Sequence, residues 1–104
     1  MMKKGTVIGD AYIIKEPLGE GSSGSVFLAG KMEGTELFTV KSSRQKGILR
    51  QEADIYREIG SEYFPGFVDY IEEGDTAYLV LEYLEGVSLQ KLLDKGRQFM
   101  ERKS

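Results

Sequence analysis

Three glycines at the spacing G-x-G-x-x-G, Gly19, Gly21 and Gly24, lie between two segments that favour β-strand. A dinucleotide-binding fold requires a helix after such glycines, and a Walker loop requires Gly-Lys-Ser or Gly-Lys-Thr at its end. Residues 25–29 instead read Ser-Val-Phe-Leu-Ala, which favours a strand, and no lysine follows until Lys31. The pattern therefore predicts a glycine hairpin, either a merely flexible one or one whose main-chain N–H groups approach phosphate oxygens.

A lysine near the end of the next strand is the second feature. Residues 35–41 are expected to form a strand that pairs with the strand before it. Period-two alternation places Thr39 and Lys41 on one face of this strand. Phe38 and Val40 then occupy the opposite face. Lys41 is either a solvated charge, as strand-end lysines usually are, or a buried cation that requires a partner.

A glutamate on the following helix is the candidate partner. Residues 46–60 have helical spacing, with Ile48 and Tyr56 among the apolar residues that recur along one side. Glu52 lies four residues before Tyr56 and therefore shares the inward stripe. A carboxylate that faces a core is costly unless a cation meets it, so Lys41 is expected to pair with Glu52. The alternative is that Glu52 reaches water at the flank of the stripe.

Taken in order, these residues resemble the N-terminal lobe of protein kinases of the eukaryotic-like serine/threonine type. The resemblance covers about residues 12–96. The three glycines and Val26 are similar to the glycine-rich loop, and residues 38–41 are similar to the Val-Ala-Ile-Lys strand. Glu52 is similar to the helix glutamate that holds the strand lysine, and residues 77–89 resemble the fifth strand, gatekeeper and hinge.

The resemblance also implies roles for single residues. It implies that Lys41 and Glu52 form the catalytic ion pair, that Leu81 is the gatekeeper, and that main-chain groups of Glu82 and Leu84 bond the edge of adenine. The cofactor would be ATP with Mg²⁺, whose ligands would lie in a C-terminal lobe; no metal ligand is assigned to this chain. The implied ATP-binding residues are Leu18, Gly19, Gly21, Gly24, Val26, Thr39, Lys41, Leu81, Glu82, Leu84 and Ser88.

The sequence also departs from the family pattern. Thr39 replaces the usual alanine above adenine, which narrows the pocket. Lys41 and Glu52 are only eleven positions apart, so the connection from strand to helix must be abrupt. Glu58 is the alternative partner of Lys41, although it lies on the side of the helix opposite the apolar stripe. The sequence contains no His, no H-R-D-x-x-x-x-N catalytic loop and no D-F-G. This chain alone is therefore expected not to transfer phosphate.

The expected fold class is α+β: a five-stranded antiparallel sheet with one long crossing helix, followed by a short C-terminal hinge helix with Ser88 as its N-cap. Residues 1–10 are expected to be a loosely held N-terminal extension. Residues 11–104 are expected to form the kinase N-terminal lobe through the hinge and the first helix of the C-terminal lobe, with the rest of that lobe absent.

Composition excludes several classes of function. The net charge is −3, and residues 52–85 carry ten acidic residues against the single base Arg57, which argues against nucleic acid as a partner. The absence of Cys and His removes disulfides and the usual zinc ligands. No apolar run has transmembrane length and no signal peptide is recognisable, so a cytoplasmic location is expected. The basic residues between positions 41 and 50 are expected to be solvated surface or a phosphate-binding cluster.

The expected function is that of an ATP-binding N-lobe that positions ATP phosphates for transfer to a hydroxyl of a protein substrate in a full-length serine/threonine kinase. This chain would be an inactive fragment of that kinase, with the missing C-terminal lobe as a further partner. The alternatives are the N-lobe of a small-molecule kinase of the aminoglycoside or choline type, and a pseudokinase or interaction module. Self-association would use an exposed apolar set, namely Leu89, Leu92, Leu93, Phe99 and Met100.

Overall fold

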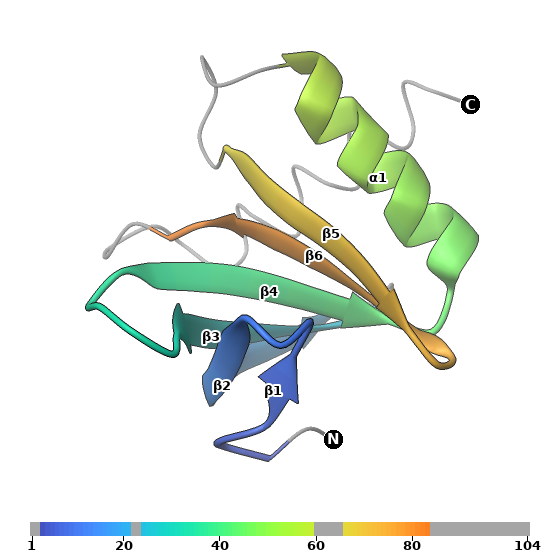
Figure 1. Ribbon diagram of the computed structural model, residues 1–104. Coiled ribbons are helices and arrows are strands. Elements are labelled where there is room, and N and C mark those ends of the chain that lie inside the picture. Colours follow the sequence, from blue (N-terminus) through green and yellow to red (C-terminus); the bar gives the residue numbers. More distant parts are fainter. Residues whose placement is uncertain (1–2, 22–23, 60–65, 84–104) are drawn as a thin grey trace.

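Alternating apolar residues along the predicted strands produce a curled antiparallel sheet with a helix beside it (Figure 1). The computed structural model describes residues 3–21, 24–59 and 66–83. Within these residues the sheet has six strands in the order β1-β2-β3-β4-β6-β5, and every neighbouring pair is antiparallel. The elements are β1 (Val7–Ile8), β2 (Tyr12–Gly21), β3 (Gly24–Lys31), β4 (Leu37–Ser43), α1 (Lys46–Ile59), β5 (Phe67–Glu73) and β6 (Thr76–Glu82).

The α+β class is confirmed, but the predicted count of five strands is wrong. The additional strand is β1, in which Val7 lies opposite Ile13 and Ile8 lies opposite Tyr12. Ile8 is only 1% exposed, so part of the segment expected to be loosely held contributes to the core. A strand of two residues is too short to show an alternating pattern in the sequence. The segment predicted to form the short hinge helix lies outside the described residues.

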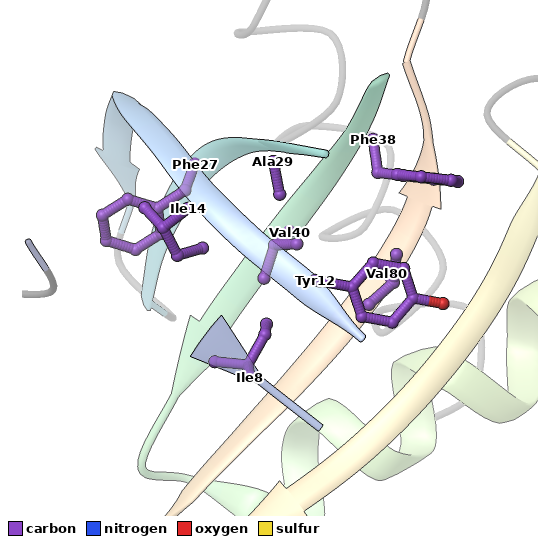
Figure 2. Close-up of a cluster of buried hydrophobic side chains, with 8 residues drawn as sticks. All are labelled: Ile8, Tyr12, Ile14, Phe27, Ala29, Phe38, Val40 and Val80. Carbon is purple, nitrogen blue, oxygen red and sulfur yellow. The ribbon is translucent and has the colours of Figure 1, made fainter. Parts of the chain in front are cut away.

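One face of the sheet carries the larger of two hydrophobic clusters (Figure 2). Phe38 and Val40 lie in this cluster, as their alternation with Lys41 predicted. The ring of Tyr12 meets that of Phe38 edge to face, with centroids 5.4 Å apart. The eight members are Ile8, Tyr12, Ile14, Phe27, Ala29, Phe38, Val40 and Val80.

The sheet curls around this cluster, so that its two ends approach each other. The Tyr12 hydroxyl of β2 donates to Asp69 Oδ2 of β5 at 3.3 Å. The backbone N–H of Gly9 donates to Glu73 Oε2 at 3.1 Å. Burial, and next the charge of Asp69, raise the pKa of the Tyr12 hydroxyl above its ordinary value. These contacts close the sheet with side chains rather than with a strand ladder.

The connection from β4 to α1 is abrupt, as the short spacing of Lys41 and Glu52 requires. The N–H of Gln45 donates to Ser43 Oγ at 3.0 Å, and the carbonyl of Gln45 accepts from the N–H of Leu49 at 3.1 Å. Only two residues, Arg44 and Gln45, therefore separate β4 from α1, and the helix packs on β5 and β6. No helix in the described part of the chain is long and apolar enough to span a membrane.

The buried side of α1 differs slightly from the predicted stripe. Ile48 was expected on the inward side but is 37% exposed, because Leu49 occupies the buried position in that turn. The second hydrophobic cluster lies between α1 and the sheet. Its members are Leu49, Ala53, Tyr56, Ala77, Leu79 and Leu81.

Candidate functional site

The strand register aligns the glycine segment with the lysine. Gly19 of β2 lies opposite Val26 of β3, Val26 lies opposite Lys41 of β4, and Lys41 lies opposite Leu79 of β6. Tyr70 of β5 completes this row opposite Leu79. Residues directly opposite each other share one face of a sheet. The register therefore places the predicted phosphate-facing glycine, one predicted wall residue and the predicted cation on a single surface.

A parallel row lies two positions away on the same face. Leu28 of β3 lies opposite Thr39 of β4, and Thr39 lies opposite Leu81 of β6. Thr39 and Leu81 are both buried. Among the described residues, Thr39 Oγ1 is a buried polar atom without a hydrogen-bond partner. The predicted gatekeeper and the residue that replaces the family alanine are thus direct neighbours beside the lysine row.

Lys41 and Glu52 form the buried ion pair that the sequence predicts. Lys41 Nζ donates to Glu52 Oε1 at 2.8 Å and to Oε2 at 3.1 Å. Lys41 is 6% exposed and Glu52 is 2% exposed. Each charge compensates the other where water is excluded. The alternative partner Glu58 lies on the exposed side of α1, so the predicted pairing of Lys41 with Glu52 is confirmed.

Apolar residues surround the ion pair. Leu49, Ala53 and Tyr56 flank Glu52 on the buried side of α1, and Leu79 lies beside Lys41 in the sheet. Burial, and next the negative charge of Glu52, raise the pKa of the Tyr56 hydroxyl well above its ordinary value. Because these apolar side chains exclude water, the attraction between the Lys41 ammonium and the Glu52 carboxylate is stronger than it would be in solvent.

The glycine hairpin joins β2 and β3, and its last pair is Gly21 opposite Gly24. Gly24 has φ of +149°, and a Cβ on it would lie 2.1 Å from the carbonyl oxygen of Ser42. Only glycine allows this approach of β3 to the end of β4. The strand β2 runs through Leu18 and Gly19 to Gly21. Leu18 lies within β2 at a shift in register between Pro17 and Gly19.

Glu82 is tied to the backbone that precedes β5. Its N–H donates to the carbonyl of Gly66 at 3.0 Å, and its Oε1 accepts from the N–H of Gly66 at 2.8 Å. Any adenine contact by the main chain of Glu82 would therefore have to use its carbonyl oxygen. The other predicted ATP-binding residues of this region, Leu84 and Ser88, lie outside the described residues.

The basic segment at the start of α1 is mostly engaged within the protein. Arg50 Nε and Nη2 donate to Glu72 Oε2 at 3.1 and 2.6 Å. Lys46 Nζ donates to the carbonyl of Gly74 in the turn between β5 and β6, whereas Arg44 is exposed. Sequence reasoning missed these contacts because Arg50 and Glu72 are separated by 22 positions. Their opposite charges were the available signal.

Metal binding by the described residues has no support in side-chain geometry. No group of three or more His, Cys, Asp or Glu side chains within these residues could hold a metal ion. Separately, Lys41 is a buried cation in the same sheet row as Gly19 and Val26, an arrangement that suits an anionic ligand.

Comparison with known families assigns this arrangement. A family model described as "Protein kinase domain" matches residues 12–104. The chain belongs to the protein kinase family. The resemblance inferred from the glycines, Lys41 and Glu52 is thereby confirmed, and the described sheet and helix form a kinase N-terminal lobe.

Relatives of this kinase chain include a probable serine/threonine-protein kinase of Bacillus subtilis, YbdM, which is 28% identical over 100 residues. A probable serine/threonine protein kinase of Arabidopsis thaliana, IREH1, is 34% identical over 96 residues. These alignments cover 88% and 85% of this chain but only 39% and 7% of the relatives, so the chain spans less than half of each.

A solved structure shows the same fold. The crystal structure of another protein's kinase domain superposes with a TM-score of 0.72 at 24% identity. The match covers 91% of this chain and 30% of that structure. The roles of individual site residues toward a nucleotide stay predictions.

Proposed function

We propose that this kinase chain binds ATP against the sheet face that carries Gly19, Val26 and Lys41. In a complete serine/threonine protein kinase it would position the ATP phosphates for transfer to a hydroxyl of a protein substrate. The observation that supports this proposal is the buried Lys41–Glu52 pair in the same sheet row as the glycine segment. The relatives are serine/threonine protein kinases, which favours a protein substrate over a small molecule.

Lys41 would be the phosphate-binding cation. An ammonium group has three N–H donors, and Glu52 accepts from Lys41 Nζ at two oxygens. A third donor is then available to a phosphate oxygen. Glu52 would act by holding the ammonium in place, because a lysine side chain without such a partner has many rotamers. Mg²⁺ bound with ATP would neutralise phosphate charge during transfer.

The apolar walls of the adenine site would come from the neighbouring row. Val26 and Leu81 are buried next to Thr39 and Lys41, and Leu18 lies at the register shift before the glycines. Thr39 fits a polar ligand because its hydroxyl is buried without a partner among the described residues. Leu81 would limit the depth of the site as the gatekeeper.

Phosphate transfer needs further groups. The 104 residues include no His and none of the catalytic-loop or D-F-G sequences that supply the base and the Mg²⁺ ligands. We therefore propose that this chain by itself binds ATP weakly, with little dependence on Mg²⁺, and does not transfer phosphate. A cytoplasmic location stays a prediction.

Calorimetric titration of the 104-residue chain with ATP and with adenosine tests the proposal. The double variant K41M/E52L removes the ion pair without leaving a buried unpaired charge. It is expected to bind ATP about tenfold or more weakly, the effect of losing one charge-assisted hydrogen bond, while its affinity for adenosine is unchanged. Lys15→Met, at an exposed lysine on β2, is the matched control and should bind both ligands like the wild type.

Three outcomes would contradict the proposal. The first is a wild-type chain that binds neither ATP nor adenosine. The second is an equal loss of affinity for both ligands in K41M/E52L, because that would show that Lys41 does not act on the phosphates. Tight, strictly Mg²⁺-dependent binding by the chain would contradict the proposed weak, metal-independent mode.

A further inference from the structure

A charged cluster near the C-terminal end of β5 joins the sheet to α1. Arg50 of α1 donates from Nε and Nη2 to Glu72 Oε2 of β5, at 3.1 and 2.6 Å. The hydroxyl of Tyr70, also on β5, donates to the same oxygen at 2.6 Å. We call Arg50, Glu72 and Tyr70 the Arg50 clamp. None of these three residues is among the predicted ATP-binding residues.

The hydrogen bonds of the Arg50 clamp define its charge state. Tyr70 has one hydroxyl proton and two acceptors within reach, Glu72 at 2.6 Å and the carbonyl of Lys46 at 3.4 Å, so the proton points to Glu72. The hydrogen bonds from Tyr70 and from Arg50 lower the pKa of Glu72. Burial, and next the bond to Glu72, raise the pKa of Tyr70 to about 12. At neutral pH the clamp is therefore a carboxylate held by one guanidinium and one neutral phenol.

The clamp is adjacent to the Lys41–Glu52 ion pair along α1. Arg50 precedes Glu52 by two residues, which places the two side chains roughly 200° apart around the helix axis. Arg50 thus contacts β5 while Glu52 contacts Lys41 on β4. Lys46, one turn earlier, adds a contact to the β5–β6 turn through the carbonyl of Gly74. Together these contacts restrain both the rotation and the tilt of α1.

We propose that the residues of the Arg50 clamp are positioning residues that hold α1 in the orientation in which Glu52 meets Lys41. The clamp would thereby set the fraction of molecules in which Glu52 holds the Lys41 ammonium in position to contact a phosphate. Its effect on ATP rests on the proposed function, whereas its effect on the Lys41–Glu52 pair does not.

The expected size of the effect follows from exposure. The side chain of Arg50 is 58% exposed and that of Glu72 is 30% exposed, so water screens this pair far more than the Lys41–Glu52 pair. Exposed pairs of this kind shift an equilibrium by about two- to fivefold. The clamp therefore biases the position of α1 and does not decide whether the chain folds.

Chemical labelling of Lys41 tests the geometry without a nucleotide. Acylation by an amine-reactive reagent, followed peptide by peptide with mass spectrometry, reports how often the Lys41 amine is unpaired and accessible. R50M and E72Q are expected to raise the labelling rate of Lys41 about two- to fivefold, while exposed Lys15 labels at the wild-type rate. Arg44→Met, at an exposed arginine six positions earlier, is the matched control and should leave Lys41 protected. A wild-type labelling rate in both R50M and E72Q would overturn the proposal.

ATP titration then separates positioning from a general loss of structure. R50M is expected to weaken ATP binding by about the same factor in the wild-type background and to have no effect in the K41M/E52L background, where Glu52 no longer acts on Lys41. An equal loss in both backgrounds would show a merely structural role and overturn the proposal. If the wild-type chain bound no ATP while R50M still exposed Lys41, the proposed function would fail and the clamp would stand.

Discussion

Removal of the Glu52 carboxylate is the most demanding test of the site. In Glu52→Leu the Lys41 ammonium, 6% exposed in the folded chain, loses both of its oxygen partners at 2.8 and 3.1 Å. Breaking a buried pair from one side costs about 3–5 kcal/mol, because it leaves an uncompensated charge in a dry environment. The cost has a ceiling of about 4.6 kcal/mol at pH 7, the free energy needed to deprotonate an ordinary lysine.

The matched double variant separates the charge from the packing. K41M/E52L replaces the pair by apolar side chains of similar length, a change that is typically neutral or stabilising. We expect its free energy of unfolding to lie within about 1 kcal/mol of the wild type or above it. The single variant should lose about 4 kcal/mol, a large share of the total stability of a domain of this size.

Urea unfolding at neutral pH measures both variants, and thermal unfolding gives an independent value. For a domain of this length the single variant should melt more than about 10 °C below the wild type. A loss of less than about 1 kcal/mol in Glu52→Leu would refute the reasoning, because it would mean that water reaches Lys41. A double variant as unstable as the single one would show that shape, and not charge, sets the cost.

Three further outcomes are expected. Gly24→Ala should destabilise the chain by more than about 1 kcal/mol in urea unfolding, because its Cβ would meet the carbonyl oxygen of Ser42 and the backbone has positive φ. Thr39→Val should raise the free energy of unfolding by about 1–2 kcal/mol, because it removes a buried hydroxyl without a partner; an unchanged melting temperature would contradict this. Alkaline titration followed by tyrosinate absorbance and circular dichroism should show unfolding as Tyr56 and Tyr70 ionise. The pKa values of both hydroxyls are raised in the folded chain, so folding favours the neutral tyrosines. The stability that this preference contributes is complete below pH 10.0, the ordinary pKa of tyrosine, and is lost as the pH rises through about 12 for Tyr70. A folded chain with ionised tyrosines would argue against it.

The sequence alone was sufficient for the central pair and its surroundings. Alternation along residues 35–41 placed Lys41 on one face, and helical spacing placed Glu52 inward four residues before Tyr56. Both patterns are periodic within a single strand or helix, so they can be recognised without knowledge of the fold. The prediction from helical spacing was wrong at Ile48, which is exposed while its neighbour Leu49 is buried. Successive residues of a helix point in directions about 100° apart, so a shift of one position exchanges a buried side chain for an exposed one.

Only the tertiary structure decided the contacts between distant segments. The addition of β1 to the sheet, the closure by Tyr12 and Asp69, and the link from Arg50 to Glu72 each depend on strand register and on the curl of the sheet. A pair such as Arg50 and Glu72 leaves no periodic trace, because its partners come from elements that could pack at many relative positions. Sequence periodicity specifies which face of an element is buried, whereas the partner of that face is chosen by the packing of the whole chain.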